Sequence, residues 1–247
     1  MGNKGNNLKK PGVKTLSIHH GETFSEETGC VMPPIFSTST FKHGNKQNID
    51  NTRSGNPNFK ILENILKSIE DSKYCTVFGS GISAVTAITS TLKSGDKILC
   101  ESNLYGCTVR MFDKIFKKFG IEALYTDFTD KESIKKIRDL QPTLIWLESP
   151  TNPLLKILDI KLICDEAYKH KIPVVLDNTF TTALIQKPLE LGATLSLIST
   201  TKFINGHSDA LGGAVLTNDE EWNSKMLFSQ KALGLQPSPF DLSLIHI

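Results

Sequence analysis

Short apolar runs alternate with longer stretches of helical periodicity along most of this 247-residue chain. Runs typical of strands occur at 74–78, 97–100, 123–125, 143–147, 173–176, 195–198 and 213–216. Apolar residues at helical spacing predict helices at 58–70, 81–93, 109–119, 130–139, 159–170 and 219–233. The runs 144–147 and 172–176 are apolar at consecutive positions, so both faces of these strands should be buried. The alternation predicts one α/β domain with a mostly parallel sheet between helices.

The first 58 residues lack this order. They are rich in Gly, Asn, Ser, Thr and Pro and include Pro33-Pro34, which predicts an extended arm instead of a domain. A long extended arm usually packs against another part of an assembly, and we expect this arm to contact a neighbouring subunit.

Composition narrows the function classes. The 28 basic and 26 acidic residues leave a net charge of +2, which gives no dense basic field for nucleic acid. No apolar run approaches the roughly 18 residues that a membrane span needs. The five cysteines are odd in number and form no CxxC pair, which favours a reduced, cytoplasmic compartment. The histidines lack metal-binding spacing, so we expect no metal.

In such sheets a ligand binds beyond the carboxyl ends of the strands. Lys202 follows the run 195–198, and lysines in partly desolvated sites form Schiff bases with aldehydes. A single lysine is more often a solvated surface residue. Asp177 ends the run 173–176, where a carboxylate could hold a pyridinium nitrogen protonated or could form an Asx turn or helix cap. A lysine and a carboxylate after two successive strands favour the chemical interpretation of both.

The segment Gly79–Gly81 opens a predicted helix, where free N–H groups and the helix dipole favour a phosphate. The hydroxyl groups of Ser199 and Thr201 are placed to complete the same site. The segment also fits a dinucleotide-binding fingerprint, with Glu101 as the ribose-binding acid. A nucleotide-binding module therefore stays open as an alternative, although it leaves the lysine and the carboxylate unexplained.

Two further residues have the right chemistry for a planar, phosphorylated cofactor. Tyr105 follows a strand and could stack on a ring, or it could be a half-buried loop tyrosine. Arg53 lies in a turn-rich loop and suits bidentate phosphate contact, or it could be a solvated surface residue. Because Arg53 precedes the core domain, it could serve the site of a neighbouring subunit.

Taken in order, these motifs resemble the transsulfuration family of pyridoxal-phosphate (PLP) enzymes, which includes cystathionine γ-lyase, cystathionine γ-synthase and methionine γ-lyase. The resemblance runs from about Gly21 to Asp241. Its motifs are Thr-Arg-Ser-Gly-Asn-Pro (52–57), Gly-Ser-Gly (79–81), Leu-Tyr-Gly (104–106), Glu-Ser-Pro-Thr-Asn-Pro (148–153), Asp-Asn-Thr-Phe (177–180), Ser-Thr-Thr-Lys (199–202) and Gly-His-Ser-Asp (206–209).

The resemblance implies the aspartate-aminotransferase-like fold, fold type I, with PLP attached covalently to Lys202 and Asp177 on the ring nitrogen. The other contacts that it implies are Tyr105 stacked on the ring and taking part in catalysis, the amides of Gly81 and Ile82 with Ser199 and Thr201 on the phosphate, Asn152 near the phenolic oxygen, and Arg53 on the phosphate of a neighbouring subunit. It also implies a dimer of dimers.

The implied reaction is carbon–sulfur cleavage of cystathionine to cysteine, 2-oxobutanoate and ammonia. Cystathionine γ-synthase or methionine γ-lyase activity is the alternative within the family. The chain departs from the family pattern at Asn51 and Phe203, where tyrosines are usual, and at Cys107, where glycine is usual.

The family continues beyond Asp241 into a smaller C-terminal domain, and residues 242–247 fit no family motif. We therefore expect an arm at 1–58, an incomplete PLP-binding domain at 59–241, a tail outside the family at 242–247, and impaired activity of this fragment.

Overall fold

The computed structural model describes residues 11–19 and 29–246. In these residues one mixed sheet has the strand order β1-β7-β6-β5-β4-β2-β3. The strands are β1 (Tyr74–Phe78), β2 (Lys97–Glu101), β3 (Glu122–Thr126), β4 (Leu144–Glu148), β5 (Val174–Asp177), β6 (Leu195–Ile198) and β7 (Gly213–Thr217). Each strand matches an apolar run of the sequence to within one residue at either end, so the expected strands are confirmed.

The strand directions define the edge of the sheet that can hold a ligand. β7 runs antiparallel to both of its neighbours, β1 and β6. The pairings of β6 with β5, β5 with β4, β4 with β2 and β2 with β3 are parallel. Because two reversals restore the direction, β1 points the same way as β6, and the carboxyl ends of all strands except β7 meet at one edge. The expected mostly parallel sheet is confirmed.

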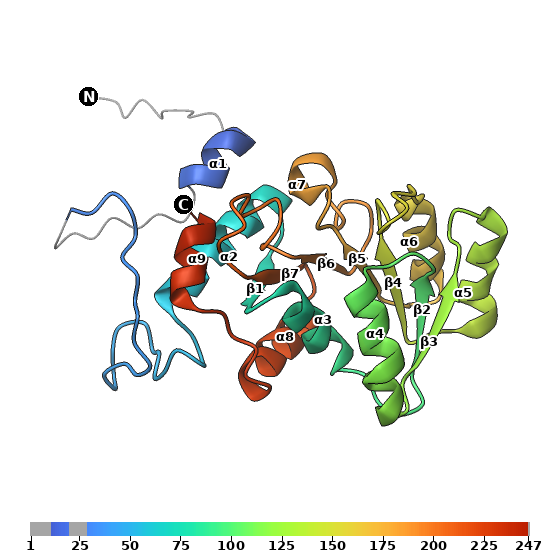
Figure 1. Ribbon diagram of the computed structural model, residues 1–247, viewed down its shortest axis with the longest axis horizontal. Coiled ribbons are helices and arrows are strands. Elements are labelled where there is room, and N and C mark those ends of the chain that lie inside the picture. Colours follow the sequence, from blue (N-terminus) through green and yellow to red (C-terminus); the bar gives the residue numbers. More distant parts are fainter. Residues whose placement is uncertain (1–10, 20–28, 247) are drawn as a thin grey trace, which may run out of the picture.

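Helices cover both faces of this sheet (Figure 1). On one face pack α3 (Gly81–Thr89), α4 (Gly106–Lys114) and α8 (Glu220–Ala232). On the other pack α2 (Pro57–Glu70), α5 (Lys135–Leu140), α6 (Ile160–Lys169) and α9 (Pro239–His246). The remaining helices are α1 (Val13–His19), α7 (Thr182–Ile185) and the 3-10 helices η1 (Phe116–Phe119) and η2 (Lys131–Ile134).

Strand β4 shows why the central runs are apolar at every position. Successive side chains of a strand point to opposite faces of the sheet. Leu144 and Trp146 pack in the cluster with α3 and α4, whereas Ile145 and Leu147 pack in the cluster with α5 and α6. Phe112 of α4 meets the Trp146 ring edge-on, with 5.2 Å between ring centroids. Burial on both faces therefore accounts for the unbroken run.

Two expected helices are shorter in the structure. The helix expected at 109–119 is α4, which ends at Lys114, followed by η1 and by Gly120 at a φ of 78°. The helix expected at 81–93 ends at Thr89. There the hydroxyl groups of Ser90 and Thr91 donate to the carbonyl groups of the preceding turn, at 2.8 Å each. Such local side-chain bonds compete with helix continuation.

The sequence pattern did not predict α1, α7 or α9. α1 lies within the expected extended arm and has no buried residue, and α7 is too short to show a period. α9 begins before the expected tail, and its Leu242 and Ile245 are buried with residues of α2. The expectations for residues 1–10, 20–28 and 247 fall outside the described residues.

Two asparagines at the start of α2 hold the N-terminal segment. Asn58 Nδ2 donates to the Pro34 carbonyl at 3.0 Å, and Asn58 Oδ1 accepts from the Phe36 amide at 2.9 Å. Asn56 Nδ2 donates to the Phe36 carbonyl at 3.0 Å. Because these bonds join residues that are 20 to 24 positions apart in the sequence, they fix the base of the segment on the domain.

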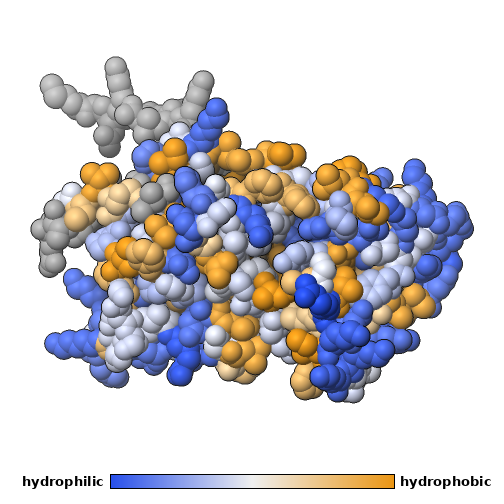
Figure 2. All heavy atoms as spheres, viewed as in Figure 1, coloured by the Kyte–Doolittle hydropathy of each residue, from blue (hydrophilic) through white to orange (hydrophobic). Residues whose placement is uncertain are grey.

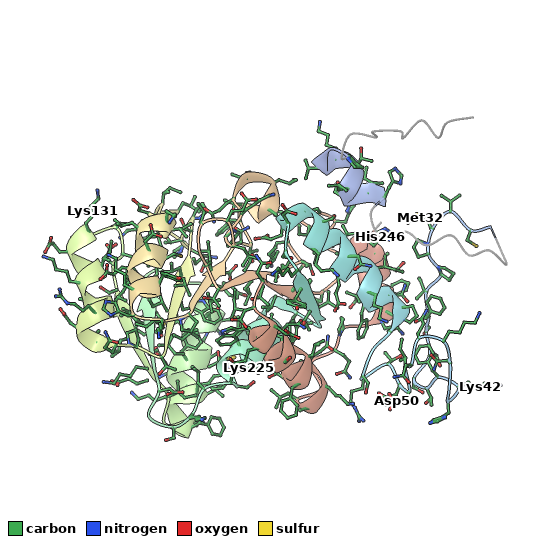
Figure 3. All side chains as sticks on the ribbon, turned by 180° about the vertical axis from the view of Figure 1, so that it is seen from behind. Met32, Lys42, Asp50, Lys131, Lys225 and His246 are labelled. Atoms are coloured by element: carbon green, nitrogen blue, oxygen red, sulfur yellow. The ribbon has the colours of Figure 1, made fainter. Side chains whose placement is uncertain are left out.

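The same segment leaves apolar side chains uncovered. Figure 3 shows Met32, Lys42 and Asp50 along it at one end of the molecule, with Lys131 of η2 at the other end. Val31 and Met32 are 69% and 41% exposed. Contact of this arm with a neighbouring subunit stays a prediction.

Candidate functional site

A cavity of about 1140 Å³ lies at the carboxyl ends of the strands. Every residue that the family resemblance implies for the site lines it except Arg53, which is exposed on the turn before α2. The predicted residues in its wall are Gly81, Ile82, Tyr105, Asn152, Asp177, Ser199, Thr201 and Lys202. The fold thus brings together side chains that lie far apart in the sequence.

Asp177 is the last residue of β5 and is 8% exposed. Its Oδ1 accepts hydrogen bonds from the amide and the hydroxyl group of Thr179, at 3.0 and 2.6 Å. Burial raises the pKa of Asp177, and the two hydrogen bonds oppose this effect because they stabilise the anion. Both bonds reach Oδ1, which leaves Oδ2 for a group in the cavity. The Asx turn and a ligand-binding role are therefore compatible.

Lys202 lies on the loop that follows β6. Its amide donates to the Ser199 carbonyl at 3.2 Å, and the Ser199 amide donates to Thr179 Oγ1 at 2.9 Å. The lysine loop is therefore tied to the turn after β5. Lys202 is exposed in the structure, as is Phe203 at 64%, because this loop lies at the surface of the domain.

The start of α3 has the features of an anion-binding cradle. Ser80 caps the helix, because its Oγ accepts from the Ser83 amide at 3.1 Å. The amides of Gly81 and Ile82 belong to the first turn, where N–H groups have no partner within the helix. The positive end of the helix dipole adds to this preference for an anion.

Glycines allow this helix start to approach its neighbours. A Cβ atom on Gly81 would lie 2.8 Å from Ser199 Cβ, and one on Gly213 would lie 2.3 Å from the Ser80 carbonyl oxygen. Real Cβ atoms essentially never make contacts shorter than 3.0 Å. Glycine is therefore required at both positions for the cradle to close.

Thr201 lies in the wall of the same cavity, on the loop after β6. Its Oγ1 donates to the Gly212 carbonyl at 3.1 Å and accepts from the Gly212 amide at 3.0 Å. The Thr201 side chain therefore also holds the segment that leads into β7.

Tyr105 precedes α4 and is 43% exposed in the cavity wall. Its amide donates to Glu148 Oε2 at 2.7 Å. A hydrogen bond with the Cys107 side chain raises the pKa of the Tyr105 hydroxyl. Cys107 Sγ in turn accepts from Arg110 Nη2 at 3.1 Å. The thiol that stands where the family usually has glycine therefore contacts the tyrosine.

Sequence reasoning missed Glu148 and Thr179, both of which line the cavity. Glu148 ends β4 and is the register partner of Asp177 on β5. Burial, with the nearby Asp177 charge, raises the pKa of Glu148 to about 8. A signal for this residue was present, because Glu148 follows the run 143–147 just as Asp177 follows the run 173–176.

Asn152 lies on the loop after β4, which is fixed at both ends. Thr151 Oγ1 accepts from the Lys156 amide at 3.0 Å, and the Thr151 amide donates to the Lys156 carbonyl at 3.0 Å. Gln186 Nε2 donates to the Ser149 carbonyl at 3.0 Å, which ties the loop to the end of α7. These bonds hold Asn152 in the cavity wall.

Glu101 bears on the nucleotide-binding alternative. Its Oε1 accepts from the Ser102 hydroxyl and the Asn103 amide, at 2.7 and 3.0 Å, and its Oε2 accepts from the Phe128 amide at 2.9 Å. Glu101 is fully buried and is not among the residues that line the cavity. The acid of the proposed fingerprint is thus engaged in loop structure.

The residues of the cavity fit pyridoxal phosphate. An amine, an available carboxylate oxygen, an aromatic side chain and a helix start narrowed by glycines surround one space of suitable size. These groups match the aldehyde, the ring nitrogen, the ring face and the phosphate of the cofactor. Fold and site together define a PLP-binding α/β domain.

Comparison with known proteins gives the same class of protein. Residues 14–246 match the Cys/Met metabolism PLP-dependent enzymes, and the chain belongs to this family. The match extends past residue 241, into the segment that we expected to lie outside the family.

Individual relatives carry more than one activity name. A probable cystathionine γ-synthase of Herpetosiphon aurantiacus is 39% identical over 95% of this chain and 74% of its own length. A putative cystathionine γ-lyase 2 of Caenorhabditis elegans is 40% identical over 96% of this chain and 62% of its own length. The crystal structure of metB from Corynebacterium glutamicum superimposes with a TM-score of 0.92 at 37% identity, covering 96% of this chain and 63% of that chain. The chain thus spans less than two thirds of the last two proteins.

Within the described ranges, no group of three or more His, Cys, Asp or Glu side chains is arranged to hold a metal ion. None of the helices formed by those residues has the length and apolar character needed to cross a membrane.

Proposed function

We propose that this chain is the cofactor-binding part of a PLP-dependent carbon–sulfur lyase that cleaves cystathionine to cysteine, 2-oxobutanoate and ammonia. The observation that carries the proposal is the convergence of Lys202, Asp177 and the start of α3 on one cavity. When bound, PLP supplies an electron sink for the electron pairs released as bonds at the substrate break.

The residues of the chain have separate tasks in this proposal. Lys202 Nζ binds the cofactor aldehyde and, after release, moves protons at the substrate Cα and Cβ. Asp177 Oδ2 keeps the ring nitrogen protonated. The remaining contacts are those of Tyr105 with the ring face, Asn152 with the phenolic side of the ring, and the Gly81 and Ile82 amides, Ser199 and Thr201 with the phosphate.

We infer that the whole enzyme is a dimer of dimers in which Arg53 contacts the phosphate in a neighbouring subunit. Arg53 is exposed and does not line the cavity of its own chain, which supports this role. Figure 2 shows apolar side chains gathered along the upper edge of the molecule, in the region of α7. There Leu184 and Ile185 are 64% and 80% exposed. A neighbouring subunit would cover such side chains.

The test of cofactor binding is a PLP titration followed by visible absorbance. The wild-type chain should develop a saturable band that Lys202→Ala loses, because the band requires covalent attachment. Lys161→Ala serves as the control, since Lys161 is exposed on α6 and pairs with Asp165 on the surface. An unchanged band in Lys202→Ala would contradict the proposal.

A synthase or methionine lyase activity is the second candidate, because the relatives carry both kinds of name. One similar solved structure is titled a methionine γ-lyase, from Micromonospora echinospora, at 32% identity and a TM-score of 0.91. Assays of a longer form of the enzyme with cystathionine, methionine and O-acylhomoserine would separate these activities. The proposal expects the highest kcat/KM with cystathionine, and a higher value with either of the others would overturn that choice.

A further inference from the structure

Glu148 lies in the cavity wall without a task in the proposed function. It is the last residue of β4 and is 4% exposed. Its Oε2 accepts the Tyr105 amide at 2.7 Å. A carboxyl group buried this deeply is costly when charged, unless it is paired with a cation. Burial therefore favours the protonated form of Glu148.

The hydrogen bonds around Glu148 and Asp177 are unequal. The two residues are register partners at the ends of adjacent parallel strands, and neighbouring carboxylates disfavour each other's charge. Asp177 accepts two hydrogen bonds from Thr179, whereas the Tyr105 amide gives Glu148 one. Because each such bond stabilises the charged form, the negative charge belongs on Asp177 and the proton on Glu148. The raised pKa of Glu148, about 8, agrees with this assignment.

We propose that Glu148 is a positioning residue that stays protonated beside Asp177, so that Asp177 carries the single charge of the pair, and that anchors the Tyr105 amide in the cavity wall. The anchor matters because Tyr105, the N-cap residue of α4, makes no side-chain capping bond. One carboxyl group thus supports both the charge at the ring nitrogen and the placement of the aromatic ring. The proposal rests on the proposed function for the identity of the cofactor.

The groups that face Glu148 leave Asp177 as its main charged partner. The titratable side chains that share the cavity wall with Glu148 are Asp177 on β5, Tyr105 and Cys107 at the start of α4, and Lys202, Asp209 and Asp241. Besides burial, only the Asp177 charge and the Tyr105 amide shift the pKa of Glu148. Arg110, one turn further along α4, and Cys107 act on the Tyr105 hydroxyl.

The first test needs no cofactor and compares Glu148→Gln with the wild type in thermal unfolding from pH 5 to 9. In the native wild type Glu148 keeps its proton up to about pH 8, whereas unfolded glutamate loses it near its ordinary value of 4.5. The native state therefore binds more protons in this window, and wild-type stability falls as the pH rises through it. The Tm of Glu148→Gln relative to wild type should rise between pH 5 and 8 and then level off. A difference independent of pH would overturn the protonated state.

The second test measures PLP affinity and the absorbance of the bound cofactor against pH. Glu148→Gln keeps an acceptor for the Tyr105 amide and should bind PLP within about threefold of wild type, whereas Glu148→Ala removes it and should bind roughly tenfold more weakly. The pH dependence of the bound-cofactor absorbance should differ between wild type and Glu148→Gln, because only the wild type can lose a proton beside Asp177. Equal weakening in both variants would contradict the anchoring role, because a purely structural defect would not distinguish them.

Glu122→Gln, which changes an exposed glutamate on β3, is the matched control and should leave both readouts unchanged. Failure of the Lys202-dependent band would remove the proposed function, while the thermal comparison would still report on the carboxyl pair. The two failures are therefore distinguishable.

Discussion

Thr179 connects the two residues on which the proposed chemistry depends. Its amide and hydroxyl groups bind Asp177 Oδ1, and the same hydroxyl accepts the Ser199 amide at the start of the lysine loop. The threonine thus fixes the carboxylate at the end of β5 relative to the loop that carries Lys202. A change at this one side chain should disturb both.

Thr179→Val keeps the shape of the side chain and removes the hydroxyl group. Asp177 then loses its 2.6 Å hydrogen bond and the Ser199 amide loses its acceptor. Each unmet buried group costs about 1–3 kcal/mol, so PLP affinity should fall at least tenfold in an absorbance titration. Thr143→Val, which removes a bond to Asp96 at the surface, is the control. Wild-type affinity in Thr179→Val would show that the link is dispensable.

Gly81→Ala tests the phosphate cradle. The added Cβ atom would lie 2.8 Å from Ser199 Cβ, so the helix start and the lysine loop must move apart. PLP affinity should fall roughly a hundredfold, because several N–H and hydroxyl contacts to the phosphate loosen together. Gly12→Ala meets no atom within 4 Å and should bind PLP as wild type does. Equal affinity of the two variants would exclude this cradle as the phosphate site.

The sequence predicted which residues form the site better than it predicted their partners and their exposure. Lys202 and Asp177 stood out because each follows a buried apolar run, at the edge of the sheet where ligands bind. The pairing of Glu148 with Asp177 was not accessible, because it depends on which strands are neighbours. The exposure of the Lys202 side chain was not predictable, because burial of a loop side chain depends on segments that the local pattern does not describe.

At the scale of elements, the reversed strand β7 determines where the cradle lies. β7 separates β1 from β6, so the helix after β1 reaches the loop after β6 across the start of β7. Gly213 at that start makes the approach possible. The run 213–216 is as apolar as those of the parallel strands, and a hydrophobic pattern carries no direction. The strands were therefore predictable, whereas the antiparallel placement of β7 was not.

Asn58 is the element-level anchor of the N-terminal segment. Asn58→Ala removes the bonds to Pro34 and Phe36, and residues 29–56 should then open more often. Limited proteolysis should cut this segment roughly tenfold faster, since local opening depends on the bonds lost. Asn64→Ala, on the same helix but away from the segment, should be cut at the wild-type rate. An unchanged rate in Asn58→Ala would place the anchor elsewhere.

At the scale of the whole molecule, buried carboxyl groups should make stability dependent on pH. Burial raises the pKa values of Glu63 and Glu70 on α2 to about 7 each. Between pH 4.5 and 7 the native state holds protons that the unfolded state releases, so stability should fall as the pH rises through this window.

Glu70→Gln should flatten this dependence in thermal unfolding, because it removes one of the titrating groups. Glu132→Gln, which changes an exposed glutamate of η2 paired with Lys135, is the control and should keep the wild-type slope. A Tm of Glu70→Gln that follows the wild-type curve at every pH would show that Glu70 is ionised in the native state throughout.

The central claim is that Lys202 is the cofactor lysine of this cavity. Incubation with PLP, reduction with borohydride and peptide mapping tests it directly, because reduction makes the attachment permanent. We expect the pyridoxyl group on the peptide that contains Lys202, with no such label in Lys202→Ala. Labelling spread over surface lysines, or unchanged in Lys202→Ala, would contradict the account.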